Sequence, residues 1–411
     1  MTLAVVYDHG AASAGDIAVG LAEVAPVVFV LPPSRHNEQL RDVLRGLGDV
    51  AVLRGDPVAD AAAVRGHRPL GIVTFSESML VTTAALADAL GLPFHSPSTV
   101  RLLTDKLAQR DRLRSGGVDD VKGHLVRSVA EWPDAVRHVG LPAVLKPLRG
   151  QGSRHTYPVT DEEEGRRLLE GLLPGDPMLL EELLLGRAAP PFGDYVSVES
   201  ACGPGGVRHL AVTGKFPLAH PFREVGKFWP ARVTPAQRAE ILALTTRALR
   251  ALGVSTGITH TEIKLTPEGP RIIEVNGRLG GHINDMAKQS CGVDLVRLAG
   301  RLALGQAVPV PPLEPGGVHF QYHTLAPVEP CRLMGSSGGK EVRRIPGISG
   351  YRTYAKKGEE LPGGVRTHFI DVLWGASGTH QAMVDILGSA LPRITHDVLI
   401  GGLHHRVSPA L

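Results

Sequence analysis

Two short apolar segments, each carrying a carboxylate, flank a tight turn and limit the folds that are open to this chain. The first segment spans Thr259 to Leu265, the second spans Arg271 to Val275, and the turn Thr266–Pro270 lies between them. Proline and glycine in so short a connection predict an antiparallel hairpin. Strand alternation then places Glu262 and Lys264 on one face of the sheet.

The second strand of this hairpin carries Glu274 and Asn276, which also share a face. If the strands pair around the turn, Glu262 and Glu274 lie close together. Neighbouring carboxylates repel each other unless a cation neutralises them, and their hard oxygen atoms suit Mg²⁺ that is also held by substrate phosphates. A solvated hairpin is the alternative, but it does not require Arg278 among apolar neighbours or the glycine pair 280–281 that follows.

The chain has 411 residues, which is enough for three compact units. We expect an N-terminal βα domain over residues 1–103 and a larger α+β domain over 104–306, divided into subdomains of about 104–181 and 182–306. A C-terminal α+β domain is expected over residues 307–411. The fold class is therefore α/β and α+β, with 43% hydrophobic and 21% charged residues as in a globular protein.

Charge and cysteine content exclude several classes of protein. Net charge is only +3 with both signs mixed along the chain, so neither nucleic acid nor a membrane is an expected partner, although the sequence pI is near 8.8. No apolar run approaches the roughly 20 residues of a membrane span. The three cysteines lack disulfide or zinc spacing, and no signal peptide is evident at the N-terminus. We therefore expect a cytoplasmic protein.

Secondary-structure signals agree with these domains. The N-terminal domain shows buried strand patterns and a helix over 79–90, which together predict a small parallel sheet, followed by a strand and turn at 92–97 and a helix capped by Ser98. The middle domain shows a helix capped by Thr234, and strands at 143–146, 178–181, 195–201 and 208–214. A linker is marked by Pro309, Pro311, Pro312 and Pro315, and a helix is expected over 380–387.

A strand that ends in Lys146 runs into the glycine-containing segment 149–154. Backbone amides and a lysine at such a loop can cradle phosphates. Without the acidic hairpin downstream, an ordinary strand end followed by a turn would explain this segment equally well.

Taken together, these segments resemble the ATP-grasp superfamily and, more narrowly, its bacterial amino-acid ligases, in which a Glu-x-Asn-x-Arg strand precedes a glycine pair. The resemblance implies an ATP-grasp fold with an N-terminal pre-ATP-grasp domain. It implies that Glu262, Glu274 and Asn276 bind Mg²⁺ ions that bridge the phosphates of ATP, and that Arg278 holds an acyl phosphate.

The same resemblance assigns the rest of the nucleotide site. Lys106, on the helix before the loop, and Lys146 correspond to the two nucleotide lysines, and Gly152 and Ser153 belong to the mobile phosphate loop. The segment 154–156, Arg-His-Thr, departs from the usual glycine and small β-branched residue, which puts the closure of the loop in doubt.

Adenine would be received at a hinge formed by Glu181, Glu182 and the backbone of Leu184, although a Glu-Glu pair by itself is more often a solvated strand end. Glu199 resembles a family acid near the phosphates and is assigned a catalytic role, with a simple exposed acid as the alternative.

The substrate pocket is expected around residues 213–230, which read as an irregular loop rich in proline and aromatic residues. In amino-acid ligases the corresponding segment lines the pocket, so Lys215, Glu224 and Lys227 are assigned to substrate binding. Many relatives have histidine where Lys227 stands. Arg278, Gly281 and His282 complete the predicted substrate-binding set. In such ligases the position of His282 limits the size of the substrate side chain.

The expected activity is ATP-dependent ligation: a carboxylate, by preference of an amino acid, is phosphorylated to an acyl phosphate, and the amine of a second amino acid displaces the phosphate. The cofactors would be ATP and Mg²⁺, with Mn²⁺ as a substitute, and the partners small molecules, with a homodimer left open. One alternative is an ATP-grasp ligase or carboxylase that uses ammonia, bicarbonate or another metabolite. Another is a nucleotide-binding protein without catalysis.

Overall fold

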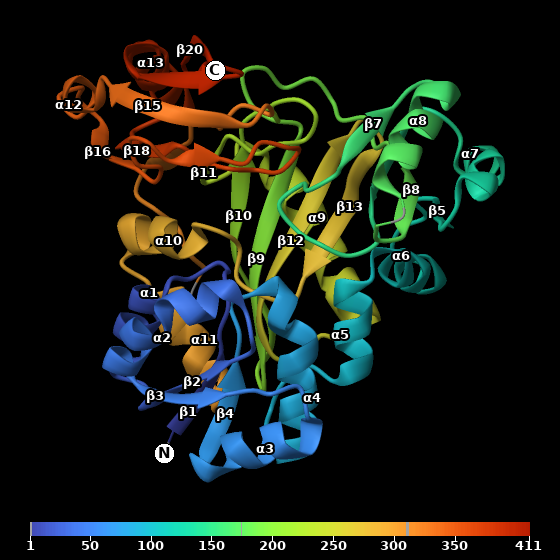
Figure 1. The fold of residues 1–411 in the computed structure, drawn as a ribbon, viewed down its shortest axis with the longest axis vertical. Helices are drawn as coiled ribbons and strands as arrows, with labels where there is room; N and C mark the ends of the chain where they lie inside the picture. Colours follow the sequence, from blue (N-terminus) through green and yellow to red (C-terminus); the bar gives the residue numbers. More distant parts are fainter. Residues whose placement is uncertain (1, 174, 310–311) are drawn as a thin grey trace.

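The computed structural model describes residues 2–173, 175–309 and 312–411, so Pro311 of the predicted linker lies outside the described residues. Four β-sheets, flanked by helices, make up the mixed α/β architecture (Figure 1). No helix within these ranges is long and apolar enough to cross a membrane. The domain limits near residues 103, 181 and 306 stay predictions.

The N-terminal unit contains the predicted parallel sheet, with strand order β3-β2-β1-β4. Its strands are β1 (Thr2–Val6), β2 (Val27–Leu31), β3 (Asp49–Val52) and β4 (Pro69–Val73). Its helices are α1 (Ala14–Leu21), α2 (Arg35–Leu47), α3 (Pro57–Gly66), η1 (Glu77–Met79) and α4 (Leu80–Leu90). The sequence analysis did not identify β3, a short edge strand in which Asp49 and Val52 are exposed.

The prediction for the segment after α4 was wrong in two details. Residues 92–97 form no strand, and helix α5 (Pro97–Thr104) is capped by Ser96 rather than Ser98. The Ser96 hydroxyl oxygen accepts the backbone N–H of Thr99 at 3.1 Å. Proline fits the first helical position because its fixed φ suits the helix and its missing N–H needs no partner there, so the cap precedes Pro97.

A second sheet of order β5-β8-β6-β7 forms the core of a smaller lobe in the middle of the chain. Its strands are β5 (Gly123–Val126), β6 (Ala143–Pro147), β7 (Tyr157–Val159) and β8 (Met178–Glu182). Its helices are α6 (Lys106–Ser115), η2 (Val129–Glu131), α7 (Trp132–Val139) and α8 (Glu162–Leu172). Lys146 on β6 and Glu181 on β8 therefore come from neighbouring strands of one sheet.

The largest sheet has eight strands in the order β13-β12-β9-β10-β11-β14-β18-β16 and joins the middle of the chain to its C-terminal part. The middle of the chain contributes β9 (Tyr195–Gly203), β10 (Gly206–Lys215), β11 (Gly226–Trp229), β12 (Gly257–Thr266) and β13 (Gly269–Asn276). The C-terminal part contributes β14 (Val318–Tyr322), β16 (Ile348–Thr353) and β18 (Asp371–Ser377). Helix α9 (Pro235–Ala251) covers one face and begins at the predicted Thr234 cap.

The remaining C-terminal elements form a fourth sheet of order β17-β15-β19-β20 with nearby helices. They are β15 (Cys331–Ser337), α12 (Gly339–Val342), β17 (Glu360–Leu361), α13 (His380–Ala390), η3 (Leu391–Arg393), β19 (Thr395–Ile400) and β20 (Leu403–Val407). Helix α13 confirms the helix expected over 380–387.

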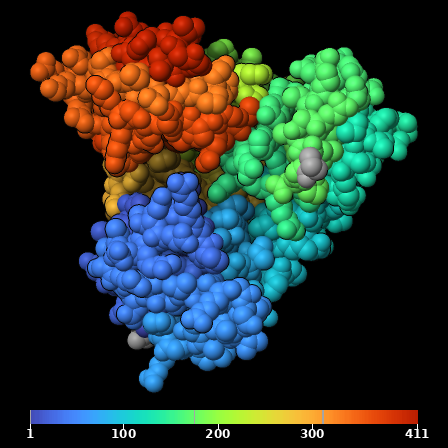
Figure 2. All heavy atoms as spheres, viewed as in Figure 1, coloured from blue at the N-terminus to red at the C-terminus, as the bar shows by residue number. Residues whose placement is uncertain are grey.

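One hydrophobic core ties the N-terminal sheet to the large sheet. Leu3 and Val5 of β1 pack in the same cluster as Leu295 and Val296 of α11 (Leu295–Ala303), which follows α10 (Ile283–Cys291). Figure 2 shows a surface hollowed where the blue N-terminal unit, the green lobe and the orange C-terminal strands meet. Residues from all three parts can therefore contribute to one site.

Candidate active site

The predicted hairpin is confirmed, and its register brings the two acids together. Strands β12 and β13 pair with Glu262 directly opposite Glu274 and with His260 opposite Asn276. The register shifts just after Glu262, which marks a bulge of the kind that re-aims side chains next to active sites. The carboxylates are thus placed on adjacent strands at one point of the large sheet.

Each of these carboxylates has a nearby cationic or hydrogen-bonding partner. Lys106 Nζ lies 3.0 Å from Glu274 Oε1, and His260 Nε2 lies 3.4 Å from Glu262 Oε1. Among the described residues no group of three or more acidic, histidine or cysteine side chains forms a complete metal site. Two carboxylates with the Asn276 amide nevertheless fit Mg²⁺, which keeps several positions for water and for phosphate oxygens.

Lys106 connects this hairpin to the phosphate loop. Its ammonium group also donates to the carbonyl of Gly150 at 2.9 Å. Burial lowers the pKa of Lys106, but the carboxylates of Glu274 and Glu77 outweigh this effect and raise it overall. The lysine is therefore charged at neutral pH and can attract phosphate oxygens.

Arg278 is held by the N-terminal unit. Its Nε lies 3.0 Å from Glu77 Oε2, on η1, and its Nη2 donates to Asn276 Oδ1 at 3.2 Å. Sequence reasoning did not find Glu77, because nothing in its local pattern distinguishes it from a helix-start acid. Burial raises the pKa of Glu77, although Arg278 opposes the shift. The predicted catalytic arginine is thus oriented by a residue 201 positions earlier in the chain, the difference between 278 and 77.

His260 and Glu199 form a buried pair beneath the hairpin acids. Glu199 is fully buried, so the alternative of a simple exposed acid does not apply. Its carboxylate lies 2.8 Å from His260 Nδ1 and accepts the Ser197 hydroxyl at 3.1 Å. Burial lowers the pKa of His260, but Glu199 and Glu262 together outweigh this effect and raise it. His260 was missed as a site residue, although its position two before Glu262 on one strand face is a signal for it.

His260 leaves no space for a side chain at position 280, which is a glycine. A Cβ atom at Gly280 would lie 2.5 Å from His260 Nδ1, whereas one at Gly281 would meet nothing within 4 Å. The expectation that both glycines admit a ligand therefore holds only for the open space at Gly281, and Gly280 serves packing.

Gly280→Ala is expected to lower the free energy of unfolding by about 1–3 kcal/mol, because His260 is anchored by Glu199 and cannot move away freely. Gly281→Ala is the matched control and should unfold within about 0.5 kcal/mol of the wild type. Chemical denaturation of both variants measures the difference. Equal stability of the two variants would contradict the close packing.

Lys146 and Glu181 belong to a buried ion cluster that Arg110 completes. Arg110 contacts both carboxylate oxygens of Glu181, at 2.7 and 2.9 Å, and Lys146 Nζ lies 2.7 Å from Oε1. Arg110 also donates to the carbonyls of Ile272 and Ile273 in β13. Burial raises the pKa of Glu181, yet the two cations lower it to about 2.

This cluster changes what the predicted hinge residues can do. Both oxygens of Glu181 are engaged by cations, so this side chain has little capacity left for an adenine amino group. Glu182 is half-buried and accepts the backbone N–H of Lys122 at 3.2 Å. Leu184, also half-buried, follows β8 in the connection to β9. Their adenine-binding roles stay predictions.

The phosphate loop lies against other parts of the site. The Ser153 hydroxyl donates to the carbonyl of Phe222 at 2.6 Å, and Gly152 accepts the N–H of Thr367 at 2.9 Å. Four residues of the loop, Gly150, Gly152, Ser153 and His155, have positive φ angles. The N–H of His155 donates to Val365, so the unusual 154–156 segment meets the C-terminal part of the chain.

The prediction of one irregular loop over 213–230 was wrong at both ends. β10 continues through Lys215, and Lys227 lies on β11, where it pairs with Lys215. Only the segment between these strands is a loop. The apolar alternation Val-Gly-Lys-Phe-Trp in the second half was obscured by the prolines around it. As a result, Lys215 and Lys227 are 1% and 3% exposed rather than on the surface.

Glu224 balances these two lysines. It forms ion pairs with Lys215 and, at 2.7 Å, with Lys227. Lys227 also donates to the carbonyl of Gly281 at 2.8 Å. Burial raises the pKa of Glu224, but both lysines hold it well below its usual range. Lys227 thus fixes the backbone beside His282, the other predicted substrate residue.

His282 lies at the start of α10 with a left-handed backbone (φ 59°). Its ring centroid is 5.1 Å from that of His323, 5.8 Å from Tyr354 and 5.7 Å from Phe369. These three residues come from the C-terminal part of the chain. The structure therefore brings the predicted site residues of the large sheet together with aromatic groups that the sequence did not suggest.

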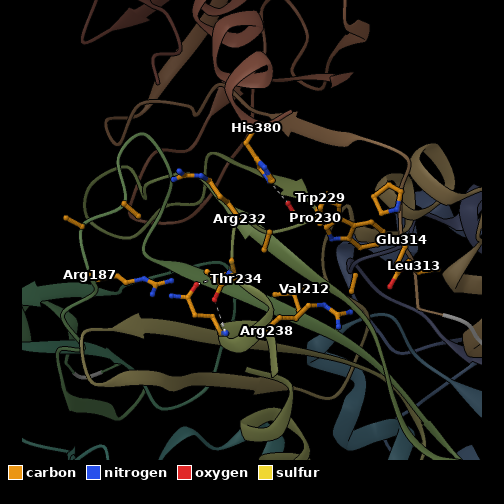
Figure 3. A pocket seen from close by; sticks show the side chains of 17 residues that line it. Arg187, Val212, Trp229, Pro230, Arg232, Thr234, Arg238, Leu313, Glu314 and His380 are labelled. Atoms are coloured by element: carbon orange, nitrogen blue, oxygen red, sulfur yellow. Dashed lines mark hydrogen bonds between the residues drawn. The ribbon is translucent and has the colours of Figure 1, made fainter. Parts of the chain in front are cut away.

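A separate cavity of about 800 Å³ lies apart from these acids (Figure 3). It is lined by Trp229 and Leu313 and by basic side chains that include Arg187, Arg232 and Arg238. None of the hairpin acids or the nucleotide lysines lines it. We therefore place the active site at the hairpin rather than in this cavity.

No family model matches the chain. Among curated proteins, human carnosine synthase 1 is 29% identical over 60% of this chain and 32% of its own length, and alanine-anticapsin ligase of Bacillus subtilis is 26% identical over 64% and 57%. An L-amino acid ligase from Bacillus licheniformis superposes with a TM-score of 0.76 and 20% identity, over 96% of this chain and 97% of that one.

The structural likeness establishes that this chain has the ATP-grasp fold, as the sequence predicted. Its sequence is similar to curated proteins that are named as a carnosine synthase and an alanine-anticapsin ligase. The chain spans about one third to somewhat more than half the length of the two curated relatives named.

Proposed function

We propose that this protein is an ATP-dependent ligase that activates the carboxylate of an amino acid and joins it to the amine of a second amino acid, releasing ADP and phosphate. The observation that carries the proposal is the facing pair Glu262 and Glu274, with Lys106 and Arg278 beside it. The similar proteins include an alanine-anticapsin ligase and an L-amino acid ligase, which supports the same activity.

The acidic and basic residues of the site have different roles in the proposed reaction. Glu262, Glu274 and Asn276 would hold Mg²⁺, which neutralises phosphate charge when bound. Lys106 and Lys146 attract the phosphate oxygens of the nucleotide. Arg278, fixed by Glu77, stabilises the negative charge that develops when the amine attacks the activated carboxyl carbon. No protein nucleophile is required, because positioning and charge neutralisation suffice for phosphoryl transfer.

Cofactor and location follow as finer proposals. The all-oxygen donor set supports Mg²⁺ as the resident cation and Mn²⁺ as a substitute, since both prefer such ligands. Structures with bound ADP or MgADP among the similar folds support ATP as the nucleotide. Three free cysteines support a reducing compartment such as the cytoplasm.

Amino-acid-dependent phosphate release tests the activity. Purified protein with ATP, Mg²⁺ and the common amino acids, scanned in pairs, is expected to release phosphate above the rate with ATP alone. Mass spectrometry of the active mixtures should show a product lighter by one water than the sum of the two amino acids. Phosphate release that no amino-acid pair increases would contradict the proposal, and release driven by ammonia or bicarbonate would favour the alternative ligase or carboxylase.

A further inference from the structure

Two buried polar atoms near Lys227 have no hydrogen-bond partner among the described residues. They are Gln321 Oε1 on β14 and Nε2 of His323, the next residue but one. Gln321 is 3% exposed and His323 is 1% exposed. Buried polar atoms are nearly always paired, so two unpaired atoms at the end of one strand and just beyond it mark a place where a ligand supplies the missing partner.

The sheet register shows that Gln321 faces the active site. Gln321 is directly opposite Lys227, and Lys227 is directly opposite Lys215. Side chains of directly opposed residues lie on the same face of a sheet, so the three form one row across β10, β11 and β14. His323 follows Gln321 by two positions and leaves the strand on the same side.

The hydrogen bond at Nδ1 of His323 determines whether its other ring nitrogen, Nε2, is a donor or an acceptor. Nδ1 lies 3.2 Å from the carbonyl oxygen of Asp371, so Nδ1 carries the proton and donates to that oxygen. Burial, reinforced by the nearby charges of His282 and Lys227, lowers the pKa of His323 well below its ordinary value and keeps the ring neutral. Nε2 therefore presents a lone pair. Like the Gln321 oxygen, it is a hydrogen-bond acceptor.

The surroundings limit the shape of the ligand group. The His323 ring stacks on Phe369 with centroids 3.9 Å apart and planes at 18°, and His282 and Tyr354 lie at the side. Flat aromatic walls favour a planar or ring-sized group, because such a group makes dispersion contacts over its whole face.

The charges nearby exclude a cationic donor. Lys227 lies directly opposite Gln321 and already shares its carboxylate partner, Glu224, with Lys215. An ammonium group would be repelled there, and burying a like charge is costly. An uncharged hydroxyl or N–H group meets no such penalty.

We propose that Gln321 and His323 determine specificity by accepting hydrogen bonds from an uncharged donor on a ring-sized side chain of one amino-acid substrate. The proposal rests on the proposed ligase function and names the class of substrate for that site. Substrates with a phenolic hydroxyl or a ring N–H belong to this class.

Matched substrate pairs test the proposal. Phosphate release is measured with tyrosine against phenylalanine and with asparagine against leucine, while the second amino acid is kept at the one that gives the highest rate. The wild type is expected to prefer the donor-bearing member of the tyrosine pair by about 10- to 100-fold in kcat/KM, because the other member leaves buried acceptors unpaired. The asparagine pair tests ring size and should show a smaller ratio.

Variants connect the preference to the two residues. Gln321→Leu and His323→Phe, which keep shape but remove the acceptor, should each reduce the tyrosine to phenylalanine ratio towards one. Gln381→Leu is the control, because Gln381 is an exposed residue on α13 and should leave the ratio unchanged. Thermal unfolding of Gln321→Leu should stay close to that of the wild type, since Oε1 has no partner within the protein. His323→Phe also loses the Nδ1 hydrogen bond to Asp371, so a modest decrease in its unfolding temperature is expected.

The outcomes separate this inference from the function on which it rests. A wild type that is active but does not distinguish tyrosine from phenylalanine would overturn the inference alone. The same holds if the variants keep the wild-type ratio, or if both unfold at much lower temperature, which would indicate a purely structural role. A wild type without amino-acid-dependent phosphate release would overturn the ligase function and the inference together.

Discussion

Glu274→Gln is expected to reduce amino-acid-dependent phosphate release by at least roughly 10³-fold, about 4 kcal/mol of transition-state stabilisation, while the protein stays folded. The substitution keeps the shape and an oxygen acceptor for Lys106, 3.0 Å away, but removes the negative charge opposite Glu262. A cation held by one carboxylate and two amides is bound far more weakly than one held by two carboxylates. Single-turnover phosphate release with saturating ATP measures the effect.

Glu268→Gln provides the matched control for this experiment. Glu268 lies in the turn of the same hairpin and is exposed, so the same change of charge there should leave the rate within about twofold of the wild type. Raising the Mg²⁺ concentration should partly restore the Glu274→Gln rate if the loss is one of cation affinity. Retained turnover in Glu274→Gln at ordinary Mg²⁺ would refute the assignment of this residue.

The hairpin could be predicted from the sequence because its signals are local. Alternating charged and apolar residues define both faces of β12 and β13, and proline and glycine define the turn. The turn fixes the pairing only as far as Ile263 opposite Ile272, and the bulge beyond it, which the sequence did not reveal, brings Glu262 opposite Glu274. The same local reasoning gave β2 and the Thr234 cap of α9.

The partners of the site residues could not be predicted, because they come from distant parts of the chain. Glu77 reaches Arg278 only after the N-terminal sheet packs on α11, and Arg110 reaches Glu181 across two elements. Neither pairing leaves a periodic signal in the sequence. Likewise, the prolines near β11 prevented its prediction as a strand. The burial of Lys227 follows only from the complete sheet.

Several of these distant contacts pair a buried cation with a carboxylate. Every strongly buried cation near the site that the sequence had assigned to binding has a carboxylate partner in the structure: Lys146 has Glu181, and Lys215 and Lys227 have Glu224. A charge buried without a partner would cost several kcal/mol, so the pairs permit a dense set of cations inside the fold. Under the proposed function, a bound phosphate would exchange partners within this existing ion network.

Glu181→Gln is expected to give the largest loss of stability, about 3–5 kcal/mol at neutral pH. The side chain is buried between Arg110 and Lys146, and its removal as an anion leaves both cations without a counter-charge. Arg110 keeps the carbonyls of Ile272 and Ile273, whereas Lys146 keeps no acidic partner. Chemical denaturation monitored by tryptophan fluorescence measures the free energy of unfolding.

The pH dependence gives this prediction its sharpest form. The folded pKa of Glu181 is about 2, below the ordinary value of 4.5, so its contribution is fully present above about pH 4.5 and is lost as pH falls towards 2. The stability difference between wild type and Glu181→Gln should therefore shrink as pH is lowered from 5 towards 2, because the variant has no proton to bind there. Glu182→Gln, on the same strand, keeps an acceptor for the Lys122 N–H and should differ from the wild type by less than about 1 kcal/mol at every pH. A stability gap for Glu181→Gln that stays constant over this range would mean that packing, rather than the buried charge, accounts for the stabilisation by Glu181.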